Sequence, residues 1–395
     1  MAARAGGAPL PARALAPYVL AGIGGVAAWF PLLTLLLPIK VAALAGEARV
    51  GVLATCAVLG SIAAGAANIV FGWLGDRSVA RGRGRRGWLV GGVLATAATL
   101  MLLAAATTAR VLVIDVMLFQ VAVNALLAAA GALTAEEVPD TRKGLVSGLL
   151  AIGPPAGAGL SALLLASGMG EFARLAAVAA IVAGLVLPLA LIRAPARVSP
   201  PPAAERPRRR RDLAVAWVAR LLMQVAGCAV PLYLLYYVDA LAGRTSDAAT
   251  SVAWLLLVGT TLPAPAAVLI GRWSDRSGRR TPFLSCAALV AALGLAAMAA
   301  AATWPVGAAG YVLFAGGSNV FVALNLGLAM QLLPDPARRG RDMGLINLAN
   351  TLPSTIGPLL AWGLAKAGHF DTALAGLALV TAAAAGLTLL VREAA

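Results

Sequence analysis

Twelve apolar stretches, each long enough to cross a lipid bilayer, restrict the fold of this chain more than any other feature of its sequence. A membrane-spanning helix needs about 20 predominantly apolar residues. Six stretches lie in the first half, centred on 17–39, 50–74, 88–108, 111–134, 145–168 and 173–192. Six lie in the second half, centred on 213–238, 249–271, 283–303, 306–333, 343–365 and 371–391. The pattern predicts an all-α membrane protein with twelve transmembrane helices.

The composition supports the bilayer as the solvent of this chain. Hydrophobic residues make up 61% and charged residues 12%, against about 45–50% and about 25% in soluble domains. The net charge of +15 raises the possibility of nucleic-acid binding. The positive residues, however, form short clusters between apolar stretches without interleaved aromatic residues, which is typical of cytoplasmic membrane loops. We therefore expect the lipid bilayer, and no nucleic acid, as a partner.

The distribution of Lys and Arg predicts the orientation. With the N-terminus in the cytoplasm, 24 of the 31 positive residues fall in cytoplasmic segments, 6 fall in outer loops, and Arg220 lies within a span. The positive-inside rule therefore places both termini in the cytoplasm. Arginine outnumbers lysine and alanine is abundant, which indicates a GC-rich bacterial genome, so a bacterial cytoplasmic membrane is the expected location.

The two halves of the chain repeat each other. The segment Gly72–Arg77 matches Gly271–Arg276 at an offset of 199, and Val138–Asp140 matches Leu333–Asp335 at an offset of 195. Between the halves, five prolines and four consecutive arginines oppose a packed element. We predict two pseudo-symmetric six-helix bundles, residues 1–193 and 213–395, joined by a cytoplasmic linker over 194–212.

One motif occurs twice, after the second and after the eighth stretch. It reads Gly-x-x-x-Asp-Arg followed by Gly-Arg-Arg. Its residues are Gly72, Asp76, Arg77, Gly84, Arg85 and Arg86 in the first copy, and Gly271, Asp275, Arg276, Gly278, Arg279 and Arg280 in the second. The motif resembles the cytoplasmic signature of the major facilitator superfamily, which implies a transporter that closes its cytoplasmic side through these loops.

The motif also has a direct physical rationale. Glycine allows two helices to approach closely, and a carboxylate is stabilised by about 0.3–2 kcal/mol at a helix N-terminus. Asp76 is thus expected to meet the start of helix 11, and Asp275 the start of helix 5. The arginines are expected either to pair with nearby acids or to anchor the loops at lipid headgroups. These acids are Glu136, Glu137, Asp140, Asp335 and Asp342.

The first copy of the motif is longer than the second, and its long form resembles that of the glycoside–pentoside–hexuronide cation symporters and the proton–sucrose symporters. The segments 138–148 and 342–353 resemble the same group. This resemblance implies uptake of a sugar or similar small polar solute. Its sodium-coupled members carry acids in helix 2, where this chain has Asn68 and Ala64. Proton coupling, or no coupling, is therefore expected rather than sodium coupling, and protons are the favoured coupling ion.

The fifth stretch carries a competing signal. The segment from Gly153 to Gly159, Gly-Pro-Pro-Ala-Gly-Ala-Gly, resembles the Gly-Pro-x-x-Gly-Gly motif of proton–drug antiporters. Prolines kink transmembrane helices and glycines allow tight packing, so ordinary helix packing also accounts for the segment. Proton-linked efflux of drugs or hydrophobic metabolites is therefore the alternative function.

Polar residues within the apolar stretches are candidates for binding substrate or protons, since they are costly in lipid. The candidates are Asp115, Gln120, Asn124, Arg220, Gln224, Tyr233, Asn325, Asn347 and Asn350. Asp115 is either a proton carrier or an interfacial carboxylate near Arg110. Arg220 either faces a cavity or extends its long side chain to the cytoplasmic interface.

The sequence offers no catalytic constellation. His369 is the one histidine, the three cysteines have no metal-ligand spacing, and a phosphate-binding Gly-x-x-x-x-Gly-Lys loop is absent. We therefore expect a monomeric secondary transporter with no enzyme activity, no cofactor and no metal, which works by alternating access. A non-transporting receptor or scaffold is a remote alternative, because duplicated gating loops would have no purpose in it.

Overall fold

The computed structural model describes residues 12–192, 206–242, 248–333, 335–365 and 370–392, and these residues contain helices but no strand. The first half comprises α1 (Ala12–Pro31), α2 (Leu37–Ala45), α3 (Arg49–Ala80), α4 (Arg86–Ala105), α5 (Ala109–Glu137), α6 (Lys143–Leu150), α7 (Gly153–Ala166) and α8 (Glu171–Leu191). The second half comprises α9 (Arg206–Ala242), α10 (Ala248–Thr261), α11 (Pro263–Ser277), α12 (Thr281–Ala299), α13 (Trp304–Leu332), α14 (Arg339–Ala365) and α15 (Phe370–Leu389).

These helices account for all twelve predicted spans. A π-helical turn, Leu32–Leu36, joins α1 to α2 in one span, while α6 with α7 and α10 with α11 each form a broken span. Within the described residues, 11 segments are long and apolar enough to cross a membrane. The remaining predicted span, 343–365, lies within α14. The predicted all-α fold class is therefore confirmed.

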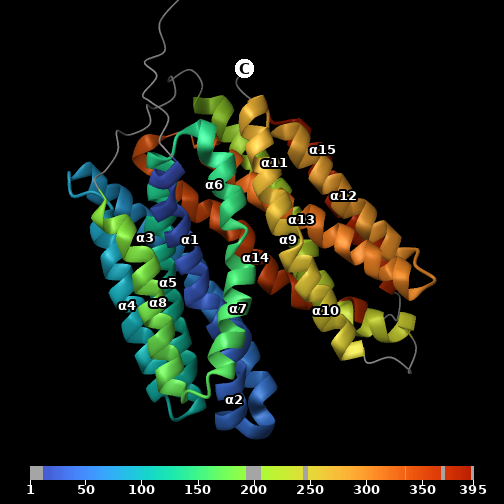
Figure 1. Ribbon diagram of the computed structural model, residues 1–395, viewed down its shortest axis with the longest axis horizontal. Coiled ribbons are helices and arrows are strands. Elements are labelled where there is room, and N and C mark those ends of the chain that lie inside the picture. Colours follow the sequence, from blue (N-terminus) through green and yellow to red (C-terminus); the bar gives the residue numbers. More distant parts are fainter. Residues whose placement is uncertain (1–11, 193–205, 243–247, 334, 366–369, 393–395) are drawn as a thin grey trace, which may run out of the picture.

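The helices form two bundles, each with its own hydrophobic core. One core contains buried side chains from α1 to α8, such as Leu100 and Phe119, and the other contains side chains from α9 to α15, such as Leu284 and Phe321. The two bundles are seen side by side in Figure 1. Each half therefore buries most of its apolar side chains within itself, and a smaller apolar cluster, in which Ala135 packs with Met330 and Met343, joins the two halves.

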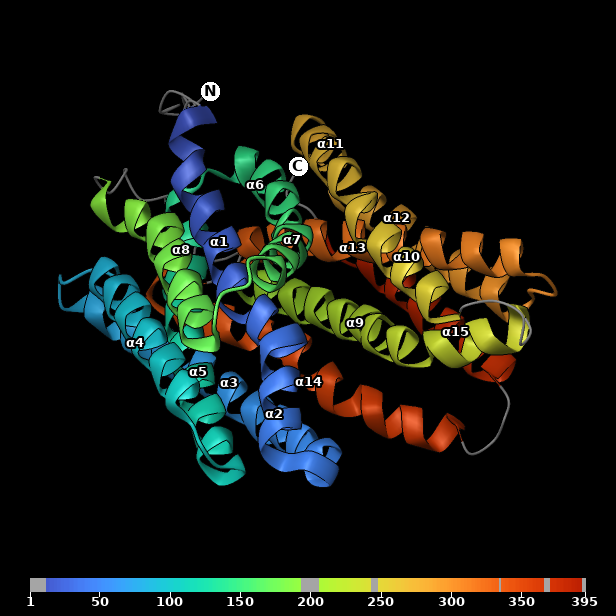
Figure 2. The same cartoon turned by 60° about the horizontal axis from the view of Figure 1, so that its bottom comes forward.

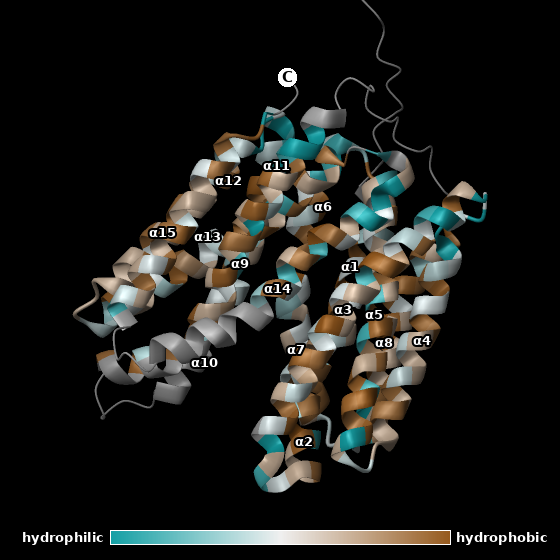
Figure 3. Cartoon of the chain, turned by 180° about the vertical axis from the view of Figure 1, so that it is seen from behind, coloured by the Kyte–Doolittle hydropathy of each residue, from teal (hydrophilic) through white to brown (hydrophobic). Residues whose placement is uncertain are grey.

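The outer surface of the bundles suits lipid. Leucines such as Leu94, Leu163 and Leu379 are 65–74% exposed, and a water-soluble protein seldom exposes contiguous apolar surface on this scale. Figure 3 shows hydrophobic residues along the helices, and hydrophilic residues gathered at the end of the molecule where α1 begins and α15 ends. We call this end the terminal end.

Each half contains one broken span, the fifth span of the first half and the second span of the second half. The break between α6 and α7 falls at Ala151 and Ile152, just before Pro154, and the break between α10 and α11 falls at Leu262, just before Pro263. Proline has no N–H to donate and therefore interrupts a helix. The kink predicted in helix 5 is present, whereas the break in helix 8 was not predicted.

The linker ends earlier than predicted. Helix α9 begins at Arg206, so the last residues of the predicted 194–212 segment are helical, and residues 194–205 lie outside the described residues. Pro207 falls in the first turn, where proline is tolerated. The guanidinium of Arg209 donates to the Gln331 carbonyl at 2.6 Å and so ties this turn to α13. This packing overrides the repulsion among the arginines.

Contacts between the bundles concentrate at the terminal end. Helix α3 packs against α14, and α6 packs against α11 and α13. Figure 2 shows α14 running between α3 and α9. Away from this end the ribbons of the two bundles diverge, as Figure 1 and Figure 3 both show.

Candidate functional site

The first copy of the repeated motif joins α3 to α14. The Asp76 carboxylate accepts hydrogen bonds from the backbone N–H groups of Gly340 and Arg341 at 2.8 and 2.9 Å. These groups belong to the first turn of α14, where backbone donors lack helical partners. Gly72 lies so close to Gly340 that a Cβ on either glycine would clash with the carbonyl oxygen of the other. The contact expected from the sequence for Asp76 is present.

A buried charge network surrounds this contact. Arg85 donates to Asp76 through Nη2 and to Glu136 through Nε and Nη2 at 3.0 and 2.8 Å. The next residue, Arg86, forms a bidentate pair with Glu137 at 2.8 and 2.9 Å. The side chains of Asp76, Arg85, Glu136 and Glu137 are at most 7% exposed. The guanidinium of Arg85 thus holds α5 to the end of α3.

The second copy joins α11 to α6 in the same way. Asp275 accepts from the backbone N–H groups of Gly144 and Leu145 at 3.0 and 2.7 Å, and Arg280 donates to it at 2.5 Å. A Cβ on Gly271 would clash with the Gly144 carbonyl. We call the Asp76 and Asp275 contacts, with their glycines and arginines, the two latches.

The latches are not identical. The position equivalent to Glu136 at the offset of 195 is Gln331, which carries no charge. Gln331 donates to the Asp140 carbonyl at 2.8 Å, and Arg280 donates to the same carbonyl at 3.3 Å. Since a charged acceptor strengthens a hydrogen bond, the latch at Asp76 is the more strongly paired of the two.

The remaining motif residues serve the turns or face solvent. Gly84 and Gly278 have φ angles of +69° and +67°, a region that glycine enters without strain. Arg77 is exposed and stacks over Trp73 at 5.2 Å, and Arg276 and Arg279 are exposed. For these three arginines, placement near lipid headgroups stays a prediction.

A cavity of about 340 Å³ lies between the bundles. Both bundles line it, through α1, α3, α5, α6 and α7 on one side and α9, α13 and α14 on the other. Most of its lining is apolar, including Trp29, Leu127, Leu326 and Met330. Its polar lining residues are Tyr18, Asn68, Thr134, Ser147, Arg220, Asn319, Asn347 and Asn350. An apolar cavity with a few polar groups is the usual form of a small-molecule site.

Arg220 and Asn350 organise the wall formed by the second bundle. The guanidinium of Arg220 donates through Nε to the Asn350 side chain at 2.9 Å, and through Nη1 to the Val322 carbonyl at 2.8 Å. Gln224 donates to the same Asn350 oxygen at 3.2 Å, and Asn350 donates to Asn347 at 2.9 Å. These bonds cross from α9 to α13 and α14. Arg220 therefore faces the cavity wall and does not extend to the membrane interface.

The wall formed by the first bundle is neutral. Asn68 donates to the Asn124 side chain at 3.0 Å, and Asn124 donates to the Gln120 carbonyl at 2.8 Å. Towards the terminal end, the hydroxyl of Tyr18 donates to Glu137 at 2.5 Å. This bond connects the cavity lining to the charge network at the Asp76 latch.

Comparison with family models decides the family. The model of the Major Facilitator Superfamily matches residues 18–241 and 215–395, which together cover nearly the whole chain. The chain belongs to the major facilitator superfamily. Proteins of this superfamily are transporters and not enzymes, so this major facilitator protein is not an enzyme. Comparison with curated protein sequences finds no match.

Solved structures share the fold of this major facilitator protein. A transporter of the superfamily, FucP, in the outward conformation, aligns with a TM-score of 0.75 at 16% identity over 96% of this chain and 99% of its own. The proton:xylose symporter XylE aligns with a TM-score of 0.73 at 14% identity over 96% of each chain. The human organic anion transporter MFSD10 aligns with a TM-score of 0.67 at 16% identity over 97% and 99%.

The candidates proposed from the sequence divide into three groups in this major facilitator structure. Arg220, Asn347 and Asn350 line the cavity. Gln224, Asn325 and Asn124 lie directly behind lining residues and bond to them. Asp115 and Gln120 are not among the lining residues. The structure does not describe the side chain of Tyr233.

Sequence reasoning missed several lining residues as site candidates, among them Tyr18, Trp29 and Asn68. Tyr18 and Trp29 are eleven residues apart, which is three helical turns, so both fall on one face of the first span. That spacing was the available signal. Asn68 was noted as the residue that replaces an acid in helix 2, but its own amide was not considered as a ligand.

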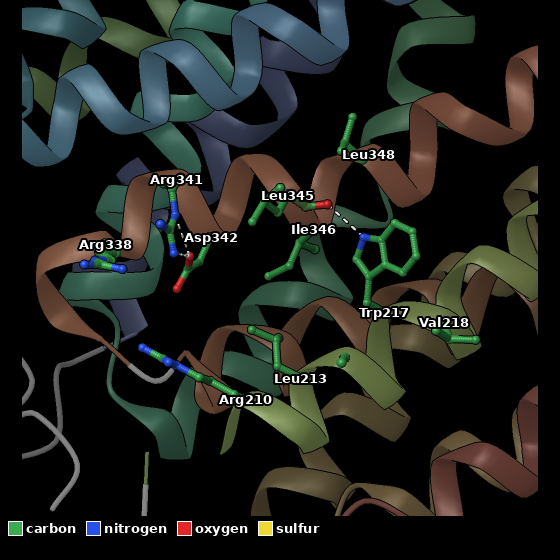
Figure 4. Close-up of a pocket in the computed structure, with 11 residues that line it drawn as sticks. Arg210, Leu213, Trp217, Val218, Arg338, Arg341, Asp342, Leu345, Ile346 and Leu348 are labelled. Atoms are coloured by element: carbon green, nitrogen blue, oxygen red, sulfur yellow. Dashed lines mark hydrogen bonds and ion pairs between the residues drawn. The ribbon is translucent and has the colours of Figure 1, made fainter. Parts of the chain in front are cut away.

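A second pocket, of about 520 Å³, lies between α9 and α14 near the terminal end (Figure 4). Its lining includes Arg210, Arg338, Arg341 and Asp342, with apolar side chains deeper in. Trp217 closes one side by donating to the Leu345 carbonyl at 2.8 Å. Because every lining residue belongs to one bundle, movement between the bundles of a major facilitator protein would not expose this pocket alternately. The central cavity is therefore the candidate transport site.

Proposed function

We propose that this protein is a secondary active transporter that moves a small polar solute through the central cavity by alternating access. The observation that carries the proposal is a polar cavity shared by two bundles whose contacts concentrate at one end, at the latches. Each latch carboxylate is held by backbone donors of a helix in the other bundle. Such contacts contribute about 0.3–2 kcal/mol each. This is enough to favour the conformation that is closed at this end, while the open conformation stays accessible.

The terminal end is the cytoplasmic end in this proposal. The excess of Lys and Arg at the predicted inner loops supports this orientation, and Figure 3 shows the hydrophilic residues at that end. With the latches closed there, the structure corresponds to a state that faces outward. The alignment with FucP in the outward conformation agrees with this assignment. We further propose a monomer in the bacterial cytoplasmic membrane.

A sugar or similar polyol is the substrate class that the sequence resemblance favours, and two aligned structures are sugar:proton symporters, FucP for fucose and XylE for xylose. Amide groups such as Asn68, Asn347 and Asn350 both donate and accept, as hydroxyl groups require. Proton-linked efflux of drugs or hydrophobic metabolites remains the second candidate, because most of the cavity lining is apolar and the organic anion transporter MFSD10 shares the fold.

Protons are the proposed coupling ion, and we place the carrier at Glu137 rather than at Asp115. Glu137 is buried, accepts from the cavity-lining hydroxyl of Tyr18 and pairs with Arg86. Protonation of Glu137 would weaken the Arg86 pair and so affect the nearby Asp76 latch. Asp115 lies towards the opposite end of α5, outside the cavity lining.

A test uses a single cysteine within the cavity. Ala128 lines the cavity on α5, so Ala128→Cys is made after Cys56, Cys228 and Cys286 are replaced by alanine. Membrane-impermeant thiol reagents are applied to right-side-out and to inverted vesicles. Alternating access predicts modification from both sides, with modification from one side slowed when the protein is locked open to the other. A cysteine that never reacts from the cytoplasmic side would favour a non-transporting scaffold.

A further inference from the structure

Arg220 is the single charged residue among the described residues that line the central cavity. It is 4% exposed, and its position in α9 puts it well inside the predicted span. Placing a cation there is costly, by about 2.5–3.5 kcal/mol on insertion scales. This cost indicates that the positive charge of Arg220 serves a function in the cavity.

The protein does not neutralise this charge. All hydrogen-bond acceptors of Arg220 among the described residues are neutral: the Asn350 and Asn325 side chains and the Val322 carbonyl. No ion pair joins Arg220 to a described carboxylate. The buried acids Glu136 and Glu137 on α5 have other partners, since Glu137 is bound to Arg86 and Glu136 to Arg85.

The geometry also leaves part of the guanidinium available. The hydrogen bonds of Arg220 to described residues use Nε and Nη1, and no bond from Nη2 joins it to them. Because Nε and Nη1 are fixed to the wall, the remaining nitrogen is held in place without loss of freedom on binding. Asn347 and Asn350 lie beside it and line the same cavity.

We propose that the transported solute carries an anionic group, a carboxylate, phosphate or sulfonate, that pairs with Arg220. This inference rests on the proposed function and refines its substrate class from a polar solute to an anionic one. Charge-assisted pairing to arginine is short and strong, and the neutral Asn68 on the opposite wall would bond the uncharged part of the solute. A neutral sugar would leave Arg220 without a counter-charge in the closed cavity.

The experiment compares matched pairs of solutes that differ in charge. The purified protein is heated with D-glucuronate or D-glucose, with D-gluconate or D-sorbitol, and with lactate or 1,2-propanediol. The proposal predicts that an acid raises the unfolding temperature and its neutral partner does not. Arg220→Gln should weaken binding of that acid at least about tenfold, as expected when a buried charge pair loses one member. Arg220→Lys keeps the charge and should retain part of the affinity.

The proposal is overturned if a neutral solute stabilises the protein as well as its acid does, or if the acid binds Arg220→Gln unchanged. In that case transport through the cavity could still stand, and the Ala128→Cys experiment would decide it separately. If no solute shifts the unfolding temperature, quenching of Trp29 fluorescence decides. The fluorescence of Trp29 is obtained as the difference between the protein and Trp29→Phe. The measured quantity is the ratio of its quenching by the anion iodide to its quenching by neutral acrylamide. This ratio should be higher in the protein than in Arg220→Gln. Equal ratios in the protein and in Arg220→Gln would contradict the proposal. A ratio in Arg220→Lys as low as in Arg220→Gln would contradict it as well.

Discussion

The Asp76 latch makes the sharpest prediction, because one carboxylate accepts two backbone hydrogen bonds from α14 at 2.8 and 2.9 Å. Asp76→Asn keeps the shape of the side chain and removes its charge. The two backbone N–H groups bond to different carboxylate oxygens, and the amide has one oxygen, so one bond loses its acceptor and the other is weakened. The favourable interaction of the charge with the helix N-terminus is lost as well. Arg85 keeps Glu136 as a partner, so no unpaired cation is left behind.

The magnitude follows from these losses. Hydrogen bonds to charged groups contribute about 1.5–3 kcal/mol and the helix dipole about 0.3–2 kcal/mol. The asparagine oxygen still accepts a hydrogen bond and so restores part of this stabilisation. We therefore expect Asp76→Asn to destabilise the closed state of the cytoplasmic end by about 2 kcal/mol. A loss of that size raises the ratio of inward-open to outward-open protein about 30-fold.

The assay is the rate at which the cysteine introduced by Ala128→Cys reacts with an impermeant reagent from the cytoplasmic side. When opening and closing are fast, this rate follows the population of the inward-open state, so Asp76→Asn should raise it up to about 30-fold. Glu47→Gln removes an exposed carboxylate at the opposite end and should leave the rate unchanged. A rate in Asp76→Asn within about twofold of the parent would refute the reasoning.

The same contacts support two further predictions. Gly72→Ala should also speed cytoplasmic labelling, since its Cβ would clash with the Gly340 carbonyl, whereas Gly91→Ala, where a Cβ meets open space, should not change it. If Glu137 carries the proton, Glu137→Gln should abolish accumulation driven by a pH gradient and spare solute exchange, while Asp115→Asn should retain both. If accumulation is lost in Asp115→Asn and kept in Glu137→Gln, the proton carrier is Asp115, as the sequence first suggested.

The sequence was sufficient to predict the twelve spans and the partners of both latch carboxylates. Span prediction works because lipid demands long apolar helices, whatever they pack against. The latches were predictable because Asp76 and Asp275 lie next to helix ends in a duplicated motif, so the local chemistry of a helix N-terminus specifies their partners.

The cavity was predictable only in part. Arg220, Asn347 and Asn350 could be identified because they are polar residues within apolar spans, and a polar side chain in a span needs a polar neighbour. Sequence reasoning also proposed Asp115, which lies outside the cavity lining, since depth within a helix does not say which face meets the cavity. It also passed over Tyr18, because aromatic residues at the ends of spans are equally common where they face lipid. Trp29 was passed over because only the spacing to Tyr18 marks its face of the helix. The start of α9 was missed because packing of Arg209 on α13 is a tertiary contact.

The central claim, that the two bundles open and close alternately about the cavity, is tested most directly by distances between spin labels across the bundles. One pair, at the exposed positions Arg81 and Arg279, reports on the cytoplasmic end, and another pair, at Glu47 and Thr303, reports on the outer end. The account predicts two distance populations in each pair, with Asp76→Asn shifting the cytoplasmic pair to longer and the outer pair to shorter distances. A single unchanged distance in both pairs, with and without this substitution, would contradict it.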